Sequence, residues 1–359
     1  MKFIFVSCFL FSALINAHSQ PSTNLADEKT FLLGNFHLES GVTLPNAFIK
    51  YVTYGSLNKE KSNAILLPSF FTSDYRGYNA VIGSGKALDT TKYFLILSEL
   101  FANGHSSSPS NTPAPFNGPL FPFVSIRDNV NATYALVTKQ FQLRKLKSVI
   151  GFSMGAEQAF QWAVSYPEVV QSIVVYCGTA KTYPHGYVRL ESAISALKAD
   201  EDWNKGYYQK PPLKGLKAWS LHWASWFLSQ EWYRKEMYKQ MGFPTVDSFL
   251  NARIKGDEGI DANDRISQAI TWEKHDISQT APFNGNIEKA LAAIKCRVLY
   301  MPSQTDLYFP LTDAEYEKDF IPNVEFVPIP SIWGHFAGAG RNPEDNQFLN
   351  TKIRAFLLR

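Results

Sequence analysis

The stretch that decides the fold reads Val149-Ile150-Gly151-Phe152-Ser153-Met154-Gly155-Ala156-Glu157, near the middle of the 359-residue chain. An apolar run is followed by a serine between two glycines, and then by a helix-like pattern over 157–166. Gly-x-Ser-x-Gly between a strand and a helix is typical of a tight turn that projects the serine above a sheet. Gly151 and Gly155 are the small residues that this nucleophile elbow needs, so Ser153 is the candidate nucleophile. The pattern alone occurs often by chance, and the flanking strand and helix give it weight.

Short apolar runs alternate with amphipathic segments through most of the chain. Helix-like segments over 129–138 and 157–166 separate some of the apolar runs. An antiparallel pair is expected before them over 37–54, with turn residues at 40–41. This rhythm predicts an α/β fold with a mostly parallel central sheet and helices on both faces. The expected strands cover residues 64–67, 93–97, 148–151, 173–177, 297–301 and 324–329.

The alternation stops between residues 183 and 290, where helical patterns and large aromatic residues dominate. We interpret this segment as a helical cap inserted after the sixth strand. Its aromatic residues suit both core packing and the lining of a site. The proline-rich loop over 106–122 is a candidate rim for that site. The expected organisation is a first part of the core over 20–182, the cap over 183–290 and a second part of the core over 291–359.

The first twenty residues differ from the rest of the chain. Lys2 precedes an apolar run over 3–15, and the small residues Ala17 and Ser19 follow it. This pattern predicts a secretory signal peptide over 1–19 and an exported protein, either periplasmic or secreted. A membrane anchor is the alternative, although the run is short for a span. No later stretch is long enough to cross a bilayer, so the mature protein is expected to have no membrane span.

A serine hydroxyl becomes a good nucleophile only when a base takes its proton and an acid orients that base. Asp306 stands a few residues after the expected strand 297–301, and His335 stands in a glycine-flanked loop after the last expected strand. Because the carboxyl ends of parallel strands share one edge of a sheet, we expect both side chains to meet Ser153. The alternatives are Asp313 for the acid, and His105 or His275 for the base.

An ester carbonyl under attack develops negative charge, which two backbone N–H groups can stabilise. Met154, which follows the nucleophile, is expected to supply one donor. Phe70, in the loop after the strand over 64–67, is expected to supply the other, with Phe71 as the alternative. The sequence contains no metal-binding or phosphate-binding motif, so neither a metal nor a cofactor is predicted. The net charge of +3 is not clustered, which argues against nucleic acid as a partner.

These features together resemble the homoserine O-acetyltransferase family of the α/β-hydrolases, from about residue 37 to the C-terminus. The resemblance implies the α/β-hydrolase fold and a triad of Ser153, Asp306 and His335. It also implies that an acetyl group passes from acetyl-CoA through the serine to homoserine, and it leaves a homodimer as an open alternative. Besides the elbow, the stretches that carry the resemblance are Gly83-Ser84-Gly85-Lys86-Ala87-Leu88-Asp89-Thr90, Val124-Ser125-Ile126-Arg127-Asp128-Asn129-Val130, Ala199-Asp200-Glu201-Asp202-Trp203-Asn204, Asp306-Leu307-Tyr308-Phe309-Pro310 and Gly334-His335.

Two departures from that family concern the substrate. Phe336 stands where the family has an aspartate for the amino group of homoserine, and the family's arginine for the carboxylate falls near Ile194. A buried polar substrate without partners is heavily penalised, so homoserine is not the expected acceptor. We expect an exported serine esterase that acts through an acyl-enzyme on a small, rather apolar ester. The alternatives are an acyltransferase from acyl-CoA to an alcohol and a catalytically silent binding protein.

Overall fold

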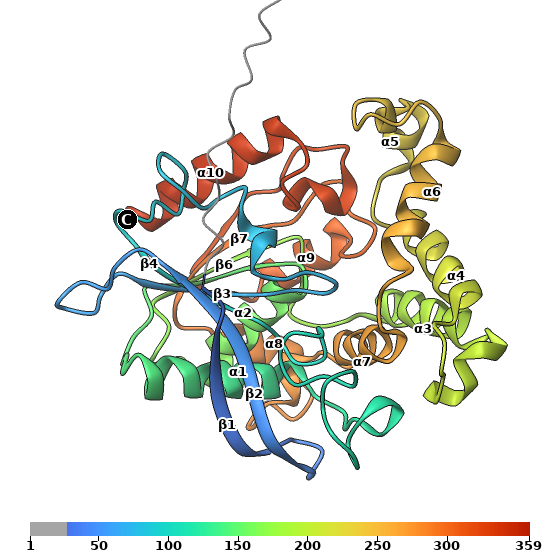
Figure 1. The fold of residues 1–359 in the computed structure, drawn as a ribbon. Coiled ribbons are helices and arrows are strands. Elements are labelled where there is room, and N and C mark those ends of the chain that lie inside the picture. Colours follow the sequence, from blue (N-terminus) through green and yellow to red (C-terminus); the bar gives the residue numbers. More distant parts are fainter. Residues whose placement is uncertain (1–26) are drawn as a thin grey trace, which may run out of the picture.

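One eight-stranded sheet forms the centre of the computed structural model, which describes residues 27–359 (Figure 1). Its strand order is β1-β2-β4-β3-β5-β6-β7-β8. β2 is antiparallel to both β1 and β4, whereas every pair from β4 to β8 is parallel, which confirms the predicted sheet. The predicted signal peptide over 1–19 lies outside the described residues. The strands are β1 (Lys29–His37), β2 (Thr43–Tyr54), β3 (Ala64–Pro68), β4 (Phe94–Ser98), β5 (Ser148–Phe152), β6 (Ser172–Tyr176), β7 (Arg297–Met301) and β8 (Val324–Phe326).

The central strands β3, β5 and β6 are buried along their whole length. Their sequences are mostly apolar, as parallel strands covered on both faces require. The last strand, β8, is shorter than the predicted span of 324–329 and ends at Phe326. Pro328 has no N–H to donate, so the chain beyond Phe326 keeps only isolated bonds to its neighbour, such as Val327 N–H to the Tyr300 carbonyl at 2.8 Å.

Helices cover both faces of the sheet. Apolar residues of α1, α2, α8 and α9 pack on one face, and those of α10 pack on the other (Figure 1). α1 begins three residues before the predicted position because Ser125 caps it in a reciprocal pair of hydrogen bonds with Asp128. The α-helices are α1 (Ile126–Ala135), α2 (Met154–Ser165), α3 (Pro184–Lys198), α4 (Leu213–Ala224), α5 (Gln230–Arg234), α6 (Val246–Asp257), α7 (Ala262–Glu273), α8 (Ile287–Ala292), α9 (Leu311–Lys318) and α10 (Pro343–Leu357). Two short 3₁₀-helices are η1 (Tyr75–Tyr78) and η7 (Gly334–Gly338).

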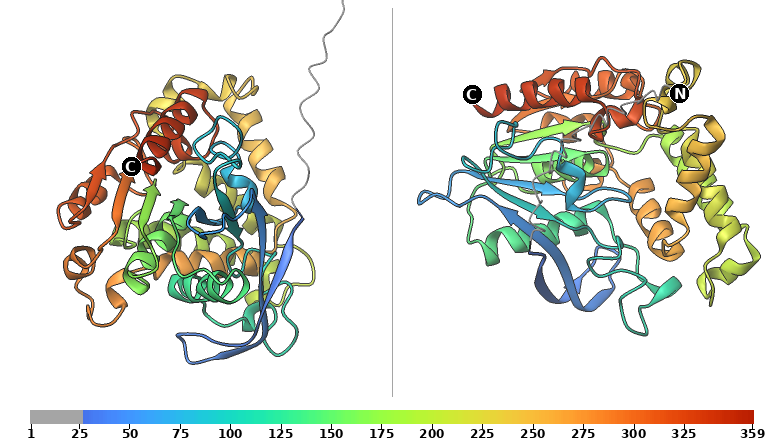
Figure 2. Two further views of the ribbon diagram at one scale, coloured as in Figure 1. Left: turned by 90° about the vertical axis from the view of Figure 1, so that its left-hand side faces the viewer. Right: turned by 45° about the horizontal axis from the view of Figure 1, so that its top comes forward.

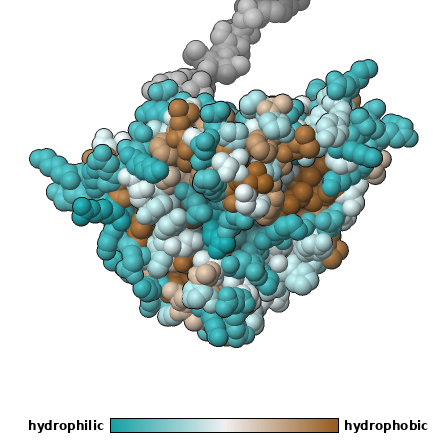
Figure 3. Space-filling view, turned by 90° about the horizontal axis from the view of Figure 1, so that it is seen from below, coloured by the Kyte–Doolittle hydropathy of each residue, from teal (hydrophilic) through white to brown (hydrophobic). Residues whose placement is uncertain are grey.

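The helices α3 to α7 follow β6 and form a cap beyond the carboxyl ends of the parallel strands (Figures 1 and 2). This arrangement confirms the predicted cap after the sixth strand. Several cap tryptophans are buried, and Trp223 and Trp272 stack with ring centroids 5.9 Å apart. Apolar surface gathers on the side of the molecule where the cap lies (Figure 3). Val188 of α3 and Leu213 of α4 are 64% and 53% exposed.

The two cysteines of the described chain lie at opposite ends of neighbouring strands. Cys177 follows β6, whereas Cys296 precedes β7, and both are buried free thiols. Their separation agrees with the parallel pairing of the two strands. Among the helices of residues 27–359, none has both the length and the apolar character needed to cross a membrane.

Candidate active site

Ser153 lies in the turn between β5 and α2, at the carboxyl edge of the sheet. Its backbone has φ 56° and ψ −128°, which a residue with a side chain adopts only under strain. A β-carbon at Gly151 would stand 2.0 Å from the carbonyl oxygen of Gly155. A β-carbon at Gly155 would stand 2.6 Å from the Tyr78 hydroxyl and 2.9 Å from the Pro68 carbonyl oxygen. The two glycines are therefore a steric requirement of this turn.

The structure brings Ser153, His335 and Asp306 into one chain of hydrogen bonds. His335 Nε2 lies 2.9 Å from Ser153 Oγ, and His335 Nδ1 lies 2.8 Å from Asp306 Oδ2. Asp306 Oδ1 accepts the backbone N–H groups of Tyr308 at 2.7 Å and Phe309 at 3.2 Å. Because these donors fix the carboxylate, Oδ2 can hold the proton of Nδ1 and leave Nε2 as an acceptor that faces the serine hydroxyl.

The imidazole of His335 is held from two sides. Its ring lies against those of Phe152 and Tyr308, with centroid distances of 4.8 and 4.5 Å. From the cap, the carbonyl of Phe227 accepts the backbone N–H of His335 at 3.0 Å. Gly334 has φ 57°, and a β-carbon there would stand 2.9 Å from the same carbonyl oxygen. The cap is therefore in close contact with the loop that carries the histidine.

The residues predicted to supply the oxyanion hole, Phe70 and Met154, lie on the two sides of the elbow. Met154 is the first residue of α2, so its N–H has no acceptor within the helix. Among the described residues, no acceptor faces the backbone N–H of Phe70, Phe71 or Met154. A β-carbon at Gly155 would stand 3.9 Å from the β-carbon of Phe70, which places Phe70 beside the elbow. Phe70 and Met154 thus remain the predicted donors. The backbone N–H groups of Phe70 and Phe71 are both without an acceptor among the described residues, so this observation does not choose between these two residues.

A cavity of about 240 Å³ lies over Ser153 and His335. We call it the inner cavity. Its volume restricts the part of a substrate next to the serine to a small group. Three charged side chains also line it, and sequence reasoning missed all of them: Arg253 and Asp257 of α6, and Arg341. The aromatic residues of the wall are Phe70, Phe71, Phe152, Trp219, Trp223, Phe227, Tyr308 and Phe336.

Sequence reasoning also missed Arg189 of α3, which is fully buried beneath the loop of Asp306. Its Nη1 donates to the carbonyls of Leu307 at 3.2 Å and Tyr308 at 2.7 Å. Its guanidinium also lies 4.8 Å from the ring centroid of Trp272. Burial lowers the pKa of Arg189 to about 10, so it stays charged at neutral pH. Arg189 therefore positions the loop that carries the acid.

One buried carboxyl group lies close to the elbow without taking part in the hydrogen-bond chain. Glu157 is fully buried on α2, one turn after Ser153. Burial raises the pKa of Glu157 well above its usual value, and the charge of Arg189 opposes this shift only in part. This shift disfavours a negative charge on Glu157 beneath the site.

The alternatives for acid and base lie elsewhere. Asp313 lies in the first turn of α9 and does not line the inner cavity. His275 is buried at the end of α7, where burial lowers its pKa to about 3. His105 lines a different cavity from the one at Ser153. The loop over 106–122 does not line the inner cavity as expected, because it packs against α7 and contributes to a separate cavity of about 340 Å³.

The two departures from the acetyltransferase pattern have clear structural consequences. Phe336 stacks on Phe227 of the cap, with centroids 4.5 Å apart and planes 12° from parallel. Ile194 is buried in the core and does not line the inner cavity. Neither position offers a charge to an amino acid substrate. Within residues 27–359, no cluster of three or more histidine, cysteine, aspartate or glutamate side chains is arranged to hold a metal ion.

Comparison with known proteins agrees with this geometry. The family described as alpha/beta hydrolase fold matches residues 65–339. Ethyl acetate hydrolase of Pseudomonas veronii is 34% identical over 316 residues, which are 87% of this chain and 90% of that protein. Homoserine O-acetyltransferase of Methanococcoides burtonii is 31% identical over 85% of this chain and 68% of its own length. The structure of the acetyl esterase MekB covers 93% of this chain and 97% of its own, with a TM-score of 0.91 and 32% identity. The predicted resemblance is confirmed, and the chain belongs to the α/β-hydrolase family.

Proposed function

We propose that this protein hydrolyses small, rather apolar carboxylic esters through an acyl-enzyme on Ser153. The observation that carries the proposal is the hydrogen-bond chain from Ser153 through His335 to Asp306, on the floor of a small aromatic cavity. Relatives named ethyl acetate hydrolase and acetyl esterase support both the reaction type and a short acyl group.

In the acylation step, Ser153 Oγ attacks the ester carbonyl while His335 Nε2 takes its proton. Asp306 stabilises the imidazolium that forms, and its fixed carboxylate keeps the ring in the required orientation. The backbone N–H groups of Met154 and Phe70 stabilise the negative charge on the carbonyl oxygen. The bond between the carbonyl carbon and the alcohol oxygen then breaks, and Nε2 gives its proton to the departing alcohol.

In the deacylation step, a water molecule takes the place of the alcohol. His335 removes its proton as the water oxygen attacks the acyl carbon of the ester on Ser153. The bond to Oγ breaks, the serine regains a proton from Nε2, and a carboxylic acid is released. Hydrolysis and acyl transfer share the first step and differ only in which hydroxyl group enters the second.

Transfer to an alcohol is the second candidate function. The likeness to homoserine O-acetyltransferases favours it, as does an aromatic wall that limits the access of water to the acyl-enzyme. Homoserine itself is a poor fit, because Phe336 and Ile194 replace the charged residues that the resemblance assigns to its recognition. A less polar acceptor would be required for this alternative.

Release of p-nitrophenol from p-nitrophenyl acetate, butyrate and octanoate tests the proposal directly. We expect fast turnover of the acetate, and a loss of at least about a thousandfold in Ser153→Ala. Ser192→Ala, an exposed serine on α3, is the matched control and should retain full activity. Diversion of the acyl group to added alcohols, or thiol release from acetyl-CoA, would replace hydrolysis by transfer. Unchanged activity in Ser153→Ala would refute both functions.

Export and self-association are further proposals. The signal-like pattern over 1–19 supports export, and N-terminal sequencing of the exported protein should find a start near residue 20. A protein that stays in the cytoplasm with Met1 in place would contradict this.

The exposed apolar residues of α3 and α4 support a homodimer (Figure 3). Light scattering after size exclusion should then give twice the mass of one chain.

A further inference from the structure

A larger cavity of about 610 Å³ adjoins the inner cavity. We call it the outer cavity. Both cavities are lined by the same five residues where they meet, and the outer one contains neither Ser153 nor His335. A substrate with its carbonyl at Ser153 can therefore extend into the outer cavity. The shared residues are Thr72, Ser73, Gly77, Ala339 and Arg341.

The walls of the two cavities carry an excess of positive charge. Four arginines line them, against two aspartates, which gives a formal charge of +2 before any contribution from His105. The aromatic residues belong to the inner cavity, so polarity increases from the serine toward the outer cavity. The arginines are Arg76, Arg253, Arg265 and Arg341, and the aspartates are Asp74 and Asp257.

The carboxylates near these arginines already have partners. Asp74 forms an ion pair with Arg76 and caps η1. Asp257 accepts the hydroxyl of Ser220. Asp264, the neighbour of Arg265 in sequence, accepts both the backbone N–H of Ser110 at 3.0 Å and its hydroxyl at 2.7 Å. None of these carboxylates lies within ion-pair distance of Arg253, Arg265 or Arg341.

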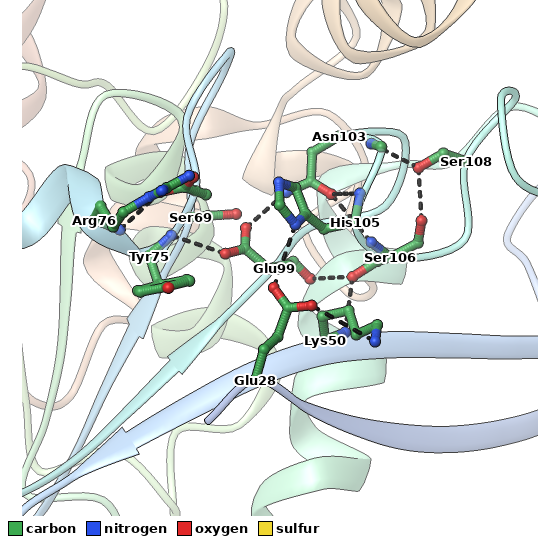
Figure 4. A network of polar contacts seen from close by, with 12 residues as sticks. Glu28, Lys50, Ser69, Tyr75, Arg76, Glu99, Asn103, His105, Ser106 and Ser108 are labelled. Carbon is green, nitrogen blue, oxygen red and sulfur yellow. Dashed lines mark hydrogen bonds and ion pairs between the residues drawn. The ribbon is translucent and has the colours of Figure 1, made fainter. Parts of the chain in front are cut away.

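Two further carboxylates beside the outer cavity are held in a separate network (Figure 4). Glu99 accepts the backbone N–H of Tyr75 at 2.8 Å and the amide of Asn103 at 2.6 Å. Glu28 faces Lys50 at 3.5 Å and His105 at 3.3 Å. These acids are therefore bound to groups other than the arginines of the cavities.

Three arginine side chains consequently lack an acceptor within the described part of the chain. Within residues 27–359, Arg253, Arg265 and Arg341 form neither an ion pair nor a side-chain hydrogen bond, and the Nε atoms of Arg253 and Arg265 are buried. Burial lowers the pKa of Arg265 to about 10, although the charges of Asp257 and Asp264 act in the opposite direction, and the side chain stays charged at neutral pH. A guanidinium binds carboxylates through paired, charge-assisted hydrogen bonds, so a carboxylate from a substrate suits this group of donors.

We propose that the outer cavity binds a carboxylate on the alcohol part of the ester, so that the substrates are short-chain acyl esters of hydroxy acids. This inference rests on the proposed function and deepens it. The acyl group stays on Ser153 during the second half of the reaction, which suits the small aromatic inner cavity. The alcohol must depart, and the larger polar cavity receives it. Water then converts the acyl-enzyme to the free acid, so the net products are the acid and the hydroxy acid. The proposed ester is thus apolar in its acyl part and carries its charge on the alcohol part.

The test compares 3-acetoxypropanoate with its neutral amide, 3-acetoxypropanamide, by the rate of acetate release from the full mature protein. The measured quantity is the ratio of kcat/KM for the anion to kcat/KM for the amide. We expect the wild type to prefer the anion by about tenfold or more. The preference should shrink as sodium chloride is raised, because salt screens an attraction in an open cavity.

Two variants and one control connect the preference to its residues. Arg265→Gln and Arg341→Gln should each move the ratio toward one, and Arg341 is exposed, so its replacement should not disturb folding. Arg144→Gln, an exposed arginine before β5, should leave the ratio unchanged. Each ratio is measured within one protein, so a general loss of activity cancels.

Four outcomes would overturn this inference while leaving ester hydrolysis intact. The first is that the wild type cleaves the amide as well as the anion, or better. The second is that the preference for the anion persists in both arginine variants, and the third is that Arg144→Gln loses it. The fourth is a preference for an anion on the acyl side, tested with mono-p-nitrophenyl succinate. Failure to cleave either acetate ester or p-nitrophenyl acetate would instead refute the proposed function.

Discussion

Replacement of Asp306 by asparagine changes the hydrogen-bond chain at one defined point. In the structure, Oδ1 accepts the N–H groups of Tyr308 and Phe309, and Oδ2 faces His335 Nδ1. In Asp306→Asn, the amide oxygen must keep the side of the two backbone donors. The reverse orientation would set an NH₂ group against two N–H groups and leave them unpaired, at about 1–3 kcal/mol each. The NH₂ group therefore faces the imidazole and donates to Nδ1.

The consequence for the reaction follows from the tautomer. With Nδ1 as an acceptor, the ring proton of His335 moves to Nε2, which then cannot take the proton of Ser153. The variant also lacks the carboxylate that stabilises the imidazolium. An asparagine at the acid of such a triad lowers kcat by about 10⁴. This factor corresponds to a barrier higher by about 5.5 kcal/mol.

The assay is kcat for p-nitrophenyl acetate, measured with thermal unfolding of the same preparation to confirm that the variant is folded. Asp313→Asn is the control, since Asp313 lies in the first turn of α9 and does not line the inner cavity. It should retain the wild-type rate. If a folded Asp306→Asn keeps more than about one hundredth of the wild-type kcat, the assigned role of Asp306 is wrong. A large loss in Asp313→Asn would point to the alternative acid.

Three further changes test the elbow, a buried histidine and the cavity wall. Gly155→Ala should lower the free energy of unfolding in urea by about 1–3 kcal/mol, because its β-carbon would meet the Tyr78 hydroxyl and the Pro68 carbonyl. An unaltered stability would contradict this steric explanation. Burial lowers the pKa of His275 to about 3, so below pH 6.5 only the unfolded chain gains a proton there, and stability should fall by about 1 kcal/mol per pH unit. Between pH 7 and pH 5, His275→Gln should lose less of its free energy of unfolding than the wild type does. An equal loss in the variant and the wild type would count against His275 as the cause. Trp219→Ala should raise kcat/KM for p-nitrophenyl octanoate relative to the acetate, unless the acyl group lies away from this wall.

The parts of the site that can be predicted from sequence are those that depend on short-range sterics or on strand order. The clash at Gly151 lies within the five-residue turn, whereas Gly155 is restricted by Tyr78 and Pro68 from other parts of the chain. The elbow could be predicted because the strand before it and the helix after it can also be recognised in the sequence. Asp306 and His335 are far apart in sequence, but each follows a parallel strand, and the carboxyl ends of such strands share one edge. Their meeting with Ser153 therefore follows from the topology, while their catalytic roles remain a prediction.

The polarity of the substrate site could not be predicted in this way. Arg253 lies on α6, Arg265 on α7 and Arg341 before α10, and no shared spacing relates them to the elbow. Which side of a cap helix faces a cavity depends on how the cap docks on the core, and that docking involves contacts such as the one between His335 and the Phe227 carbonyl. The expectation of an apolar substrate rested on two family positions, Phe336 and Ile194, which carry no charge here. The arginines that line the cavities come from other parts of the chain. Neutral residues at the two family positions therefore do not make the whole site neutral. We expect the anion-to-amide ratio to respond to replacement of the arginines and not to replacement of the two family positions.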